Sequence, residues 1–431
     1  MFQNIRKLWK IEDLLKKIIY TFLMLLLYCL VGQIYAPGVD VGYIQLMQEM
    51  GSTNALLGMM NMMTGGFTSQ MTLMAMGISP YINASIIMQL LCIAIPFLER
   101  VQQEADGREK ITRWTRYLTV ILAAVQAIGL STGMGYVYEE NRLWNQILVG
   151  VSMAGGSALA MWIGEKITDK GIGNGISLLI FAGIAGNIFE GLANVVVSLC
   201  TAGGITNRWW LLLAKLGVFL VAFLLICIAV TFVDLGERRV PLQISKQVKG
   251  RRVYGGQNTH MGLKVVSVGV LPLIFASSFL SFPQIIANFL SPTNGFRKWC
   301  EVWLSQTHPF YIIVSTLLIV LFTFFYSSIS FDAKKQAQQL QEQGATIPGS
   351  RSKNIEAYLK RSVNRLNLFA ALFLAVLNVF GSVLMSFANI GIQFAASSML
   401  IAVSVALETV RTIQGEMSIR GIDTSKDNGF M

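Results

Sequence analysis

Two short stretches decide the fold: residues 77–85 read GISPYINAS, and residues 269–277 read GVLPLIFAS. They share the pattern G-x-x-P-x-I-x-A-S, with five of nine positions identical. The copies lie in the second and seventh apolar runs of the chain. Because these runs are five apart, a chain that crosses a membrane with each run carries the copies in opposite directions. Such inverted-topology repeats meet around a central pathway near the membrane midplane. The sequence therefore predicts two inverted halves, residues 1–197 and 198–431.

The composition is that of a chain embedded in lipid. Of the 431 residues, 54% are hydrophobic and 13% are charged, and the mean hydropathy is +0.56. A soluble globular chain carries about 25% charged residues. Crossing a hydrocarbon core takes roughly 20 apolar residues. Suitable runs lie at about 18–34, 71–98, 114–134, 144–165, 174–197, 209–233, 263–288, 310–328, 366–383 and 390–411. We expect an all-α polytopic membrane protein with ten transmembrane helices.

The basic residues give the orientation of these spans. Of the 34 Lys and Arg residues, 29 fall on one side, in the N-terminus, the even-to-odd loops and the C-terminal tail. The exceptions are Arg142, Arg208, Arg297 and Lys298 on the other side, and Lys215 inside a span. Lys and Arg concentrate in cytoplasmic loops. Both termini and the two long basic loops, at about 234–262 and 330–365, are therefore predicted to be cytoplasmic.

One apolar segment, at about 56–70, is too short to span. Runs of 10–14 apolar residues are more often re-entrant or interfacial, and irregular backbone at membrane depth needs protein or a cavity around it. The segment therefore indicates a cavity on the outer side. Its candidate residues are Leu57, Met59, Met60, Met62, Met63, Gly65, Gly66 and Phe67.

The sequence shows no pattern typical of a catalytic or metal-binding site. The spans are almost bare of the ionisable residues that ion-coupled transporters place there. His260 and His308 have no partner at metal-ligand spacing, and no nucleotide-binding or nucleophile motif is present. The glycine-rich GIGNG at 171–175 lacks the preceding strand and the Lys of a phosphate loop, so we interpret it as a cytoplasmic helix entry. We expect a passive channel, with no cofactor, no metal and no catalytic residue.

Long motifs resemble the SecY family, the channel subunits of the bacterial Sec translocon. They are the stretch from Met76 through Gln126, GIGNGISLLIFAGI from residue 171, ERRVPLQISKQVKGRRVYGGQNTH from residue 237, GVLPLIFASSFLSFP from residue 269 and IPGSRSKNIEAYLKRSVNRL from residue 347. The resemblance covers nearly the whole chain in order. It implies two five-helix halves around an hourglass pore, a plug helix at 56–70 and a lateral gate between spans two to three and seven to eight.

The resemblance also implies an apolar constriction ring, whose positions are all isoleucine in this chain. They are Ile82, Ile86, Ile180, Ile184, Ile274 and Ile401. The internal repeat independently makes Ile82 and Ile274 equivalent. A narrow apolar ring dewets and blocks ions when it is empty, and it forms no bonds that would hold a passing chain.

Four polar residues are candidates for the seam of the lateral gate, namely Asn83, Gln126, Ser277 and Ser278. Ordinary hydrogen bonding between spans explains them equally well. Signal sequences and membrane spans are apolar, so a gate of this kind would let them leave sideways into lipid.

The basic loops are candidate docking sites. Their residues are Arg238, Arg239, Lys249, Arg251, Arg252, Arg351 and Lys353. They suit ribosomal RNA phosphates or the acidic surface of a motor ATPase, and attraction to anionic lipid is the simpler alternative. The resemblance implies small SecE-like and SecG-like subunits, the SecA motor ATPase, the ribosome and signal-bearing preproteins as partners, in the bacterial cytoplasmic membrane.

Other classes of protein stay open at this point. A secondary transporter built from inverted repeats predicts buried charges at the midplane, which the spans largely lack. A membrane insertase with a hydrophilic groove has only Lys215 in its favour. An accessory paralogue of the channel with fewer substrates would keep the same fold.

Overall fold

The structure is a computed structural model, and it describes most of the chain. The described residues are 12–42, 44, 64, 66–104, 106–134, 137–138, 141–187, 209–244, 247–249, 252–254, 258–266, 269, 271–290, 293–305, 308–342, 345–347, 355–388 and 396–419.

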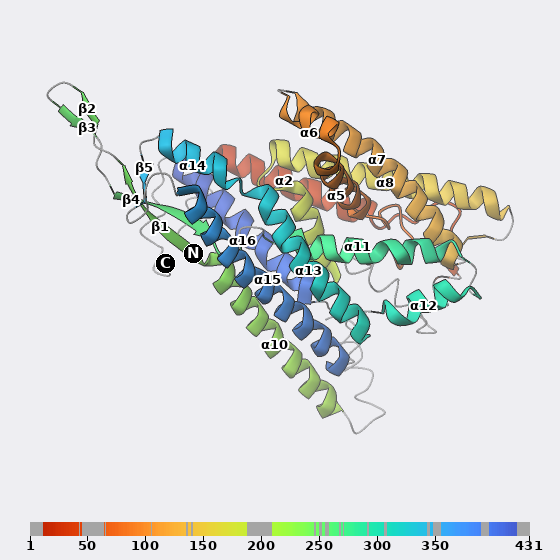
Figure 1. The fold of residues 1–431 in the computed structure, drawn as a ribbon. Coiled ribbons are helices and arrows are strands. Elements are labelled where there is room, and N and C mark those ends of the chain that lie inside the picture. Colours follow the sequence, from red (N-terminus) through yellow and green to blue (C-terminus); the bar gives the residue numbers. More distant parts are fainter. Residues whose placement is uncertain are drawn as a thin grey trace.

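Helices make up most of the described chain, and the long ones pack side by side in one bundle (Figure 1). They are α2 (Glu12–Val31), α5 (Ser79–Ala94), α6 (Pro96–Gln103), α7 (Gly107–Met134), α8 (Arg142–Lys170), the helix Gly175–Asn187, α10 (Trp209–Leu235), α11 (Leu271–Asn288), α12 (Gly295–Trp303), α13 (Pro309–Ser330), α14 (Ala333–Glu342), α15 (Ile355–Ala388) and α16 (Ala396–Ile419). Each of the ten predicted spans overlaps one of them.

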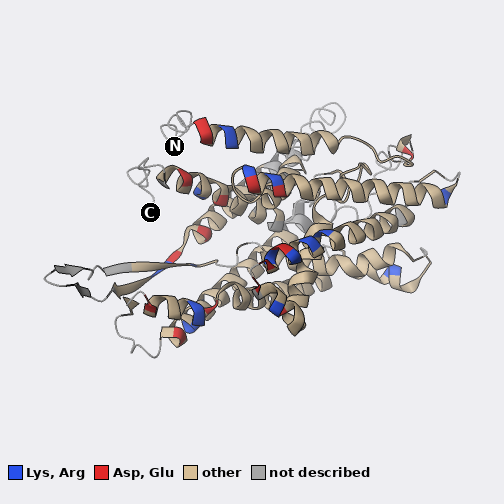
Figure 2. Cartoon of the chain, turned by 90° about the horizontal axis from the view of Figure 1, so that it is seen from above, with Lys and Arg blue, Asp and Glu red and all other residues tan. Residues whose placement is uncertain are grey.

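Six described helices are long and apolar enough to cross a membrane, and the bent pair α5–α6 makes a seventh span if it is counted as one. The bend between α5 and α6 is 108°. It falls at Ile95, directly before Pro96, where a proline disfavours helical backbone in the preceding residue. The chain is therefore a polytopic, all-α membrane protein. Its Lys, Arg, Asp and Glu residues lie mostly toward helix ends and in loops (Figure 2).

Two predicted boundaries are wrong because local pairing replaces helix. The second span begins at Ser79, since residues 66–78 form turns. These turns pair with the segment that follows α2. The Leu73 amide donates to the Ile34 carbonyl, at 2.8 Å, and the Ala36 amide donates to the Met71 carbonyl, at 3.1 Å. The seventh span begins at Leu271, since residues 258–264 form a strand.

The two long loops that the sequence analysis predicts to be cytoplasmic contain folded elements. Strands β1 (Glu237–Ile244) and β4 (Asn258–Lys264) pair antiparallel, and β5 (Ala345–Thr346) pairs with β1. The short strands β2 (Gln247–Lys249) and β3 (Arg252–Tyr254) form a hairpin that projects from the end of this ribbon (Figure 1). The predicted loop at 330–365 contains α14 and the first three turns of α15.

Separate apolar clusters stabilise the helix bundle and the strands at one end of it. The largest contains buried side chains from residues 1–197 and from residues 198–431. A second joins the ribbon to α14 and α15, with Val240, Leu263, Leu340 and Leu359 among its members. The ribbon, α14 and the start of α15 therefore have a core of their own.

Candidate functional site: an isoleucine set beneath a polar cavity

All six predicted ring isoleucines are buried in one continuous apolar cluster. Their exposed fractions are 8% for Ile82, 7% for Ile86, 4% for Ile180, 2% for Ile184, 4% for Ile274 and 4% for Ile401. Ile82 and Ile86 lie on α5, Ile180 and Ile184 on the helix Gly175–Asn187, Ile274 on α11 and Ile401 on α16. The structure thus brings this isoleucine set together from four helices and from both halves of the chain.

The repeat motif starts α5 and α11 in the same way. Gly77 and Gly269 both have positive φ, at 50° and 62°, a conformation that glycine adopts with little strain. Pro80 and Pro272 are each the second residue of the following helix, where the missing amide proton costs nothing. Ile82 and Ile274 therefore follow equivalent helix starts, as the internal repeat predicts.

The GIGNG segment is a helix entry, as the sequence interpretation holds. The side-chain carbonyl of Asn174 accepts hydrogen bonds from the amides of Ile176 and Ser177, at 3.1 and 3.4 Å, and so caps the helix Gly175–Asn187. A side chain on Gly175 would place its Cβ 2.0 Å from the Gly164 carbonyl oxygen of α8. This close approach fixes the helix that carries Ile180 and Ile184.

A polar-rimmed cavity of about 430 Å³ opens onto the isoleucine set. Ile82, Ile180 and Ile274 belong to its lining. Its polar lining residues include Asp234, Lys264, Glu408 and Arg411. The site is therefore a cavity lined by both charged residues and branched apolar side chains.

The sequence analysis missed the ion pair at this mouth. The Arg411 guanidinium donates a hydrogen bond to the Asp234 backbone carbonyl, at 3.0 Å, and lies 3.9 Å from the Asp234 carboxylate. It joins the end of α10 to α16. Both residues sit at the ends of apolar runs, which is the only signal in the sequence that would have drawn attention to them.

Three of the four predicted seam residues are buried, and they lie on α5, α7 and α11, which pack against one another. Asn83 on α5, Gln126 on α7 and Ser278 on α11 are 3%, 5% and 6% exposed. Among the described residues, the Asn83 Oδ1 and the Gln126 Nε2 are buried without a hydrogen-bond partner. Ser277 is half-buried, and its hydroxyl donates to the Ile274 carbonyl of its own helix. The predicted alternative, ordinary hydrogen bonding between spans, is not seen at these two amide atoms.

Comparison with known proteins decides the family. The family model described as SecY matches residues 72–410. The chain belongs to the SecY family.

Individual relatives extend the match to nearly the whole length. The SecY subunit of the Streptomyces galbus protein translocase is 37% identical over 442 residues, which cover 98% of this chain and 99% of that protein. A solved protein-conducting channel has a TM-score of 0.69 at 21% identity, over 95% of this chain and 94% of that one. Sec61 from the canine ribosome-channel complex of the endoplasmic reticulum has a TM-score of 0.65 at 19% identity, over 95% and 94%. The two structures establish the shared fold.

The plug predicted for this SecY-family chain lies mostly outside the described residues. Leu57, Met59, Met60, Met62, Met63 and Gly65 are among those outside. Of the predicted plug, Gly66 and Phe67 are described, and Phe67 is buried in the same cluster as the isoleucine set. Its ring packs edge-on against Tyr28 of α2, with 5.7 Å between ring centroids.

The predicted docking residues separate into two groups. Arg238 and Arg239 lie at the base of the ribbon, on β1. Lys249 and Arg252 stand directly opposite each other in the hairpin of β2 and β3. Arg251, Arg351 and Lys353 lie outside the described residues. Within the described residues, no group of three or more His, Cys, Asp or Glu is placed to hold a metal ion.

Proposed function

We propose that this SecY-family chain is the central subunit of a Sec protein-conducting channel. It passes unfolded, signal-bearing polypeptides across the membrane and releases transmembrane segments sideways into lipid. The observation that carries this proposal is the convergence of six isoleucines from both halves beneath a polar-rimmed cavity. Residues 1–197 and 198–431 would be the two halves around an hourglass pore.

The conduction of polypeptides requires both a water-accessible cavity and an apolar constriction. An extended polypeptide cannot cross hydrocarbon, because each unpaired backbone group costs several kcal/mol. An aqueous route removes this cost but threatens to leak ions. We propose that the isoleucine set is the constriction ring, which dewets when empty and so blocks ions.

We assign the seam of α5 and α7 against α11 to the lateral gate. A buried donor or acceptor without a partner costs about 1–3 kcal/mol. The Asn83 and Gln126 amides would regain partners when the seam opens to water or to a signal sequence, which favours opening. We assign the segment at about 56–70 to the plug on the outer side.

We assign the ribbon to partner docking. Lys249 and Arg252 are register partners at its tip, and a concentration of basic residues in one element favours an anionic partner. A motor ATPase such as SecA, or the ribosome, would supply the energy that this chain has no motif to provide. Sec61 from the canine ribosome-channel complex has the same fold. SecE-like and SecG-like subunits would brace the two halves.

We place the chain in the bacterial cytoplasmic membrane with both termini in the cytoplasm. The charge asymmetry of the loops supports this orientation. The start of α2 also lies against the end of α16, where the Lys17 ammonium is 2.6 Å from the Glu416 carboxylate. The two helix ends therefore belong on one side of the membrane.

Reconstitution in liposomes tests the proposal. The chain is combined with a SecE-like subunit, and SecA, ATP and a signal-bearing preprotein are added. We expect protease-protected preprotein that depends on both ATP and the signal. Absence of protection in assembled complexes would contradict a housekeeping channel and would favour an accessory paralogue with another motor or other substrates.

A further inference from the structure

A short amphipathic helix, α12, lies at the end of the bundle away from the ribbon (Figure 1). Its nine residues connect the end of α11 to the start of α13. Phe296, Trp299 and Trp303 follow one another at spacings of three and four residues, so their side chains share one face of the helix. Lys298 and Glu301 lie on another face, and both are exposed. This pattern is typical of a helix that lies along a membrane surface.

The inner edge of α12 is fixed to the transmembrane helices. Cys300 and Leu304 are buried in an apolar cluster with side chains of α11 and α13. The Gln284 side-chain amide of α11 donates to the Leu304 carbonyl, at 3.0 Å, and the Arg297 guanidinium donates to the Leu290 carbonyl, at 3.1 Å. These contacts hold α12 in place and leave its aromatic face turned outward.

The aromatic face is exposed and organised. Phe296, Trp299 and Trp303 are 42%, 42% and 43% exposed. Trp299 stacks on Phe296, with 6.2 Å between ring centroids. Both tryptophans pack edge-on against Phe310 of α13, with centroid distances of 6.1 Å from Trp299 and 5.5 Å from Trp303. An exposed apolar patch with polar residues at its rim marks a site of interaction with a protein or a membrane.

An exposed apolar stripe on α13 begins at this aromatic face. Phe310 is followed at spacings of three and four residues by Ile313, Leu317, Leu321 and Phe324, which are 66%, 61%, 52% and 39% exposed. The helix that begins at Pro309 is long and apolar enough to cross a membrane. Because the exposed face of such a helix meets hydrocarbon, the aromatic face of α12 continues a lipid-facing surface. This continuity favours lipid over a soluble protein as its partner.

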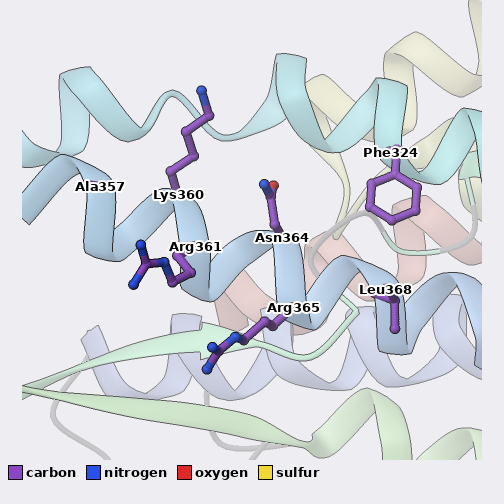
Figure 3. Close-up of a pocket in the computed structure, with 7 residues that line it drawn as sticks. All are labelled: Phe324, Ala357, Lys360, Arg361, Asn364, Arg365 and Leu368. Carbon is purple, nitrogen blue, oxygen red and sulfur yellow. The ribbon is translucent and has the colours of Figure 1, made fainter.

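The length of α13 places α12 at a membrane–water interface. With 22 residues, α13 is about 33 Å long, close to the roughly 30 Å of a hydrocarbon core. The stripe ends at Phe324, which lines a groove with the cationic turns of α15. There Lys360 lies on the α13 side of α15, and Arg361 and Arg365 point to its other side (Figure 3). These cations mark the interface at one end of the span, so α12 marks the interface at the other end.

We propose that α12 anchors the chain in the lipid headgroup interface at the end of the bundle away from the ribbon. Phe296, Trp299 and Trp303 lie among the ester groups and upper acyl chains of neutral phospholipids, and the indole N–H groups donate to lipid oxygens. Lys298 and Glu301 face water. The charge asymmetry of the loops makes this the outer leaflet. The contact is made by rings, so it needs no anionic lipid. The proposal requires α11 and α13 to cross the membrane, and it does not depend on polypeptide conduction.

Tryptophan fluorescence of the full-length chain in phosphatidylcholine liposomes tests this anchor. The variant W299F/W303F keeps aromatic rings and removes two of the eight tryptophans. The difference between the wild-type and variant emission therefore belongs to Trp299 and Trp303. The quenchers are phosphatidylcholine brominated near the headgroup, phosphatidylcholine brominated near the end of the acyl chain, and iodide in the water on both sides. Circular dichroism and size-exclusion elution check that the variants fold.

We expect the lipid brominated near the headgroup to remove roughly half or more of the difference signal. The lipid brominated near the chain end should remove less, and iodide should remove little. Addition of an anionic lipid should leave this order unchanged. A signal that is quenched by brominated lipid only when anionic lipid is present would overturn the proposal in favour of charge attraction.

The polar face of the same helix supplies the matched control. The variant K298W/W299F/W303F adds one indole to W299F/W303F, one residue away from position 299. The signal that it gains should be quenched by iodide and not by either brominated lipid. Equal lipid quenching at positions 298 and 299 would show that α12 has no preferred face toward lipid, and would overturn the proposal.

Three further results would also overturn the proposal. Quenching of Trp299 and Trp303 by iodide would place the aromatic face in water. Stronger quenching by the lipid brominated near the chain end would place α12 inside the hydrocarbon core. Protection from all three quenchers would show that protein covers the face, either a second copy of the chain or, where protection requires it, a SecE-like subunit. Failure of the liposome translocation assay would leave these readouts intact, because none of them requires transport.

Discussion

The two copies of the internal repeat start alike, and the most informative of their four differences is at the seventh position. In both, a glycine with positive φ precedes a proline-bearing helix start, followed by a buried isoleucine and a buried alanine. The seventh position is Asn83 in the first copy and Phe275 in the second. Phe275 packs edge-on against Phe322 and Tyr326 of α13, with centroid distances of 5.9 and 5.7 Å. Asn83 is equally buried, but its Oδ1 has no hydrogen-bond partner among the described residues.

We propose that this difference separates an anchored helix, α11, from a helix that parts from its neighbour when the proposed gate opens, α5. The aromatic contacts of Phe275 tie α11 to α13. The buried Asn83 oxygen gains no hydrogen bond from the contacts of α5. In this proposal, the same repeat position stabilises one half in the second copy and favours opening between the halves in the first.

The largest effect should come from substitution of the isoleucine that the two copies share, Ile82 in the first and Ile274 in the second. We expect Ile82→Ser and Ile274→Ser each to raise the ion conductance of the resting channel, on the order of ten-fold, because a hydroxyl holds water in a constriction that would otherwise dewet. Planar-bilayer recordings measure this conductance. The matched control is Ile226→Ser, a buried isoleucine of the same cluster on α10 that is not in the isoleucine set. An equal leak from the control, or a leak from only one copy, would contradict the equivalence of Ile82 and Ile274.

The next largest effect is a difference in the free energy of unfolding between variants of the two copies. Phe275→Ala should lower the free energy of unfolding by about 3–5 kcal/mol, the usual cost of removing a buried aromatic side chain. Asn83→Ala should change it by less than about 1 kcal/mol, because the lost packing is offset by removal of an unpaired buried polar atom. Denaturant titration in detergent gives both values. Equal losses would remove the distinction between an anchored and a separable helix.

The sequence predicts much of what this comparison uses, and each feature that it does not predict has a physical reason. The repeat, the spans and the isoleucine set follow from apolar periodicity and from motifs that resemble a known family. The start of the second span could not be predicted, because residues 66–78 are as apolar as a helix and only their pairing with Ile34 and Ala36 makes them turns. The core formed by the ribbon, α14 and α15 was missed because its members, from Val240 to Val363, are far apart in the sequence. The unpaired state of Asn83 depends on three-dimensional neighbours, which no local pattern reports.

A third prediction concerns the seam itself. Asn83→Leu should stabilise the closed seam by about 1–3 kcal/mol, because it replaces an unpaired amide with an apolar side chain. Translocation of a signal-bearing preprotein into liposomes should then slow, while resting conductance stays low. The control is Ser85→Ala, a half-buried residue on the same helix. Unchanged or faster translocation by the Asn83 variant would contradict the role of this residue in gating.

The smallest effect should come from the two glycines. Alanine at either position is strained by about 1–2 kcal/mol, because φ is positive. At Gly77 the new Cβ would also lie 3.2 Å from the Thr64 side chain, whereas at Gly269 no described atom lies within 4 Å. Gly77→Ala should therefore be the less stable of the two in a thermal melt. The reverse order would show that the second copy is the more tightly packed one.

Site-specific cross-linking of a stalled chain tests the central claim most directly. A photoreactive amino acid replaces Ile82, Ile274 or Ile226 in turn, and a preprotein is arrested halfway through the reconstituted channel. If a polypeptide passes through the isoleucine set, it should cross-link at positions 82 and 274 but not at position 226. Protected, arrested preprotein that fails to cross-link at both repeat positions would contradict the account.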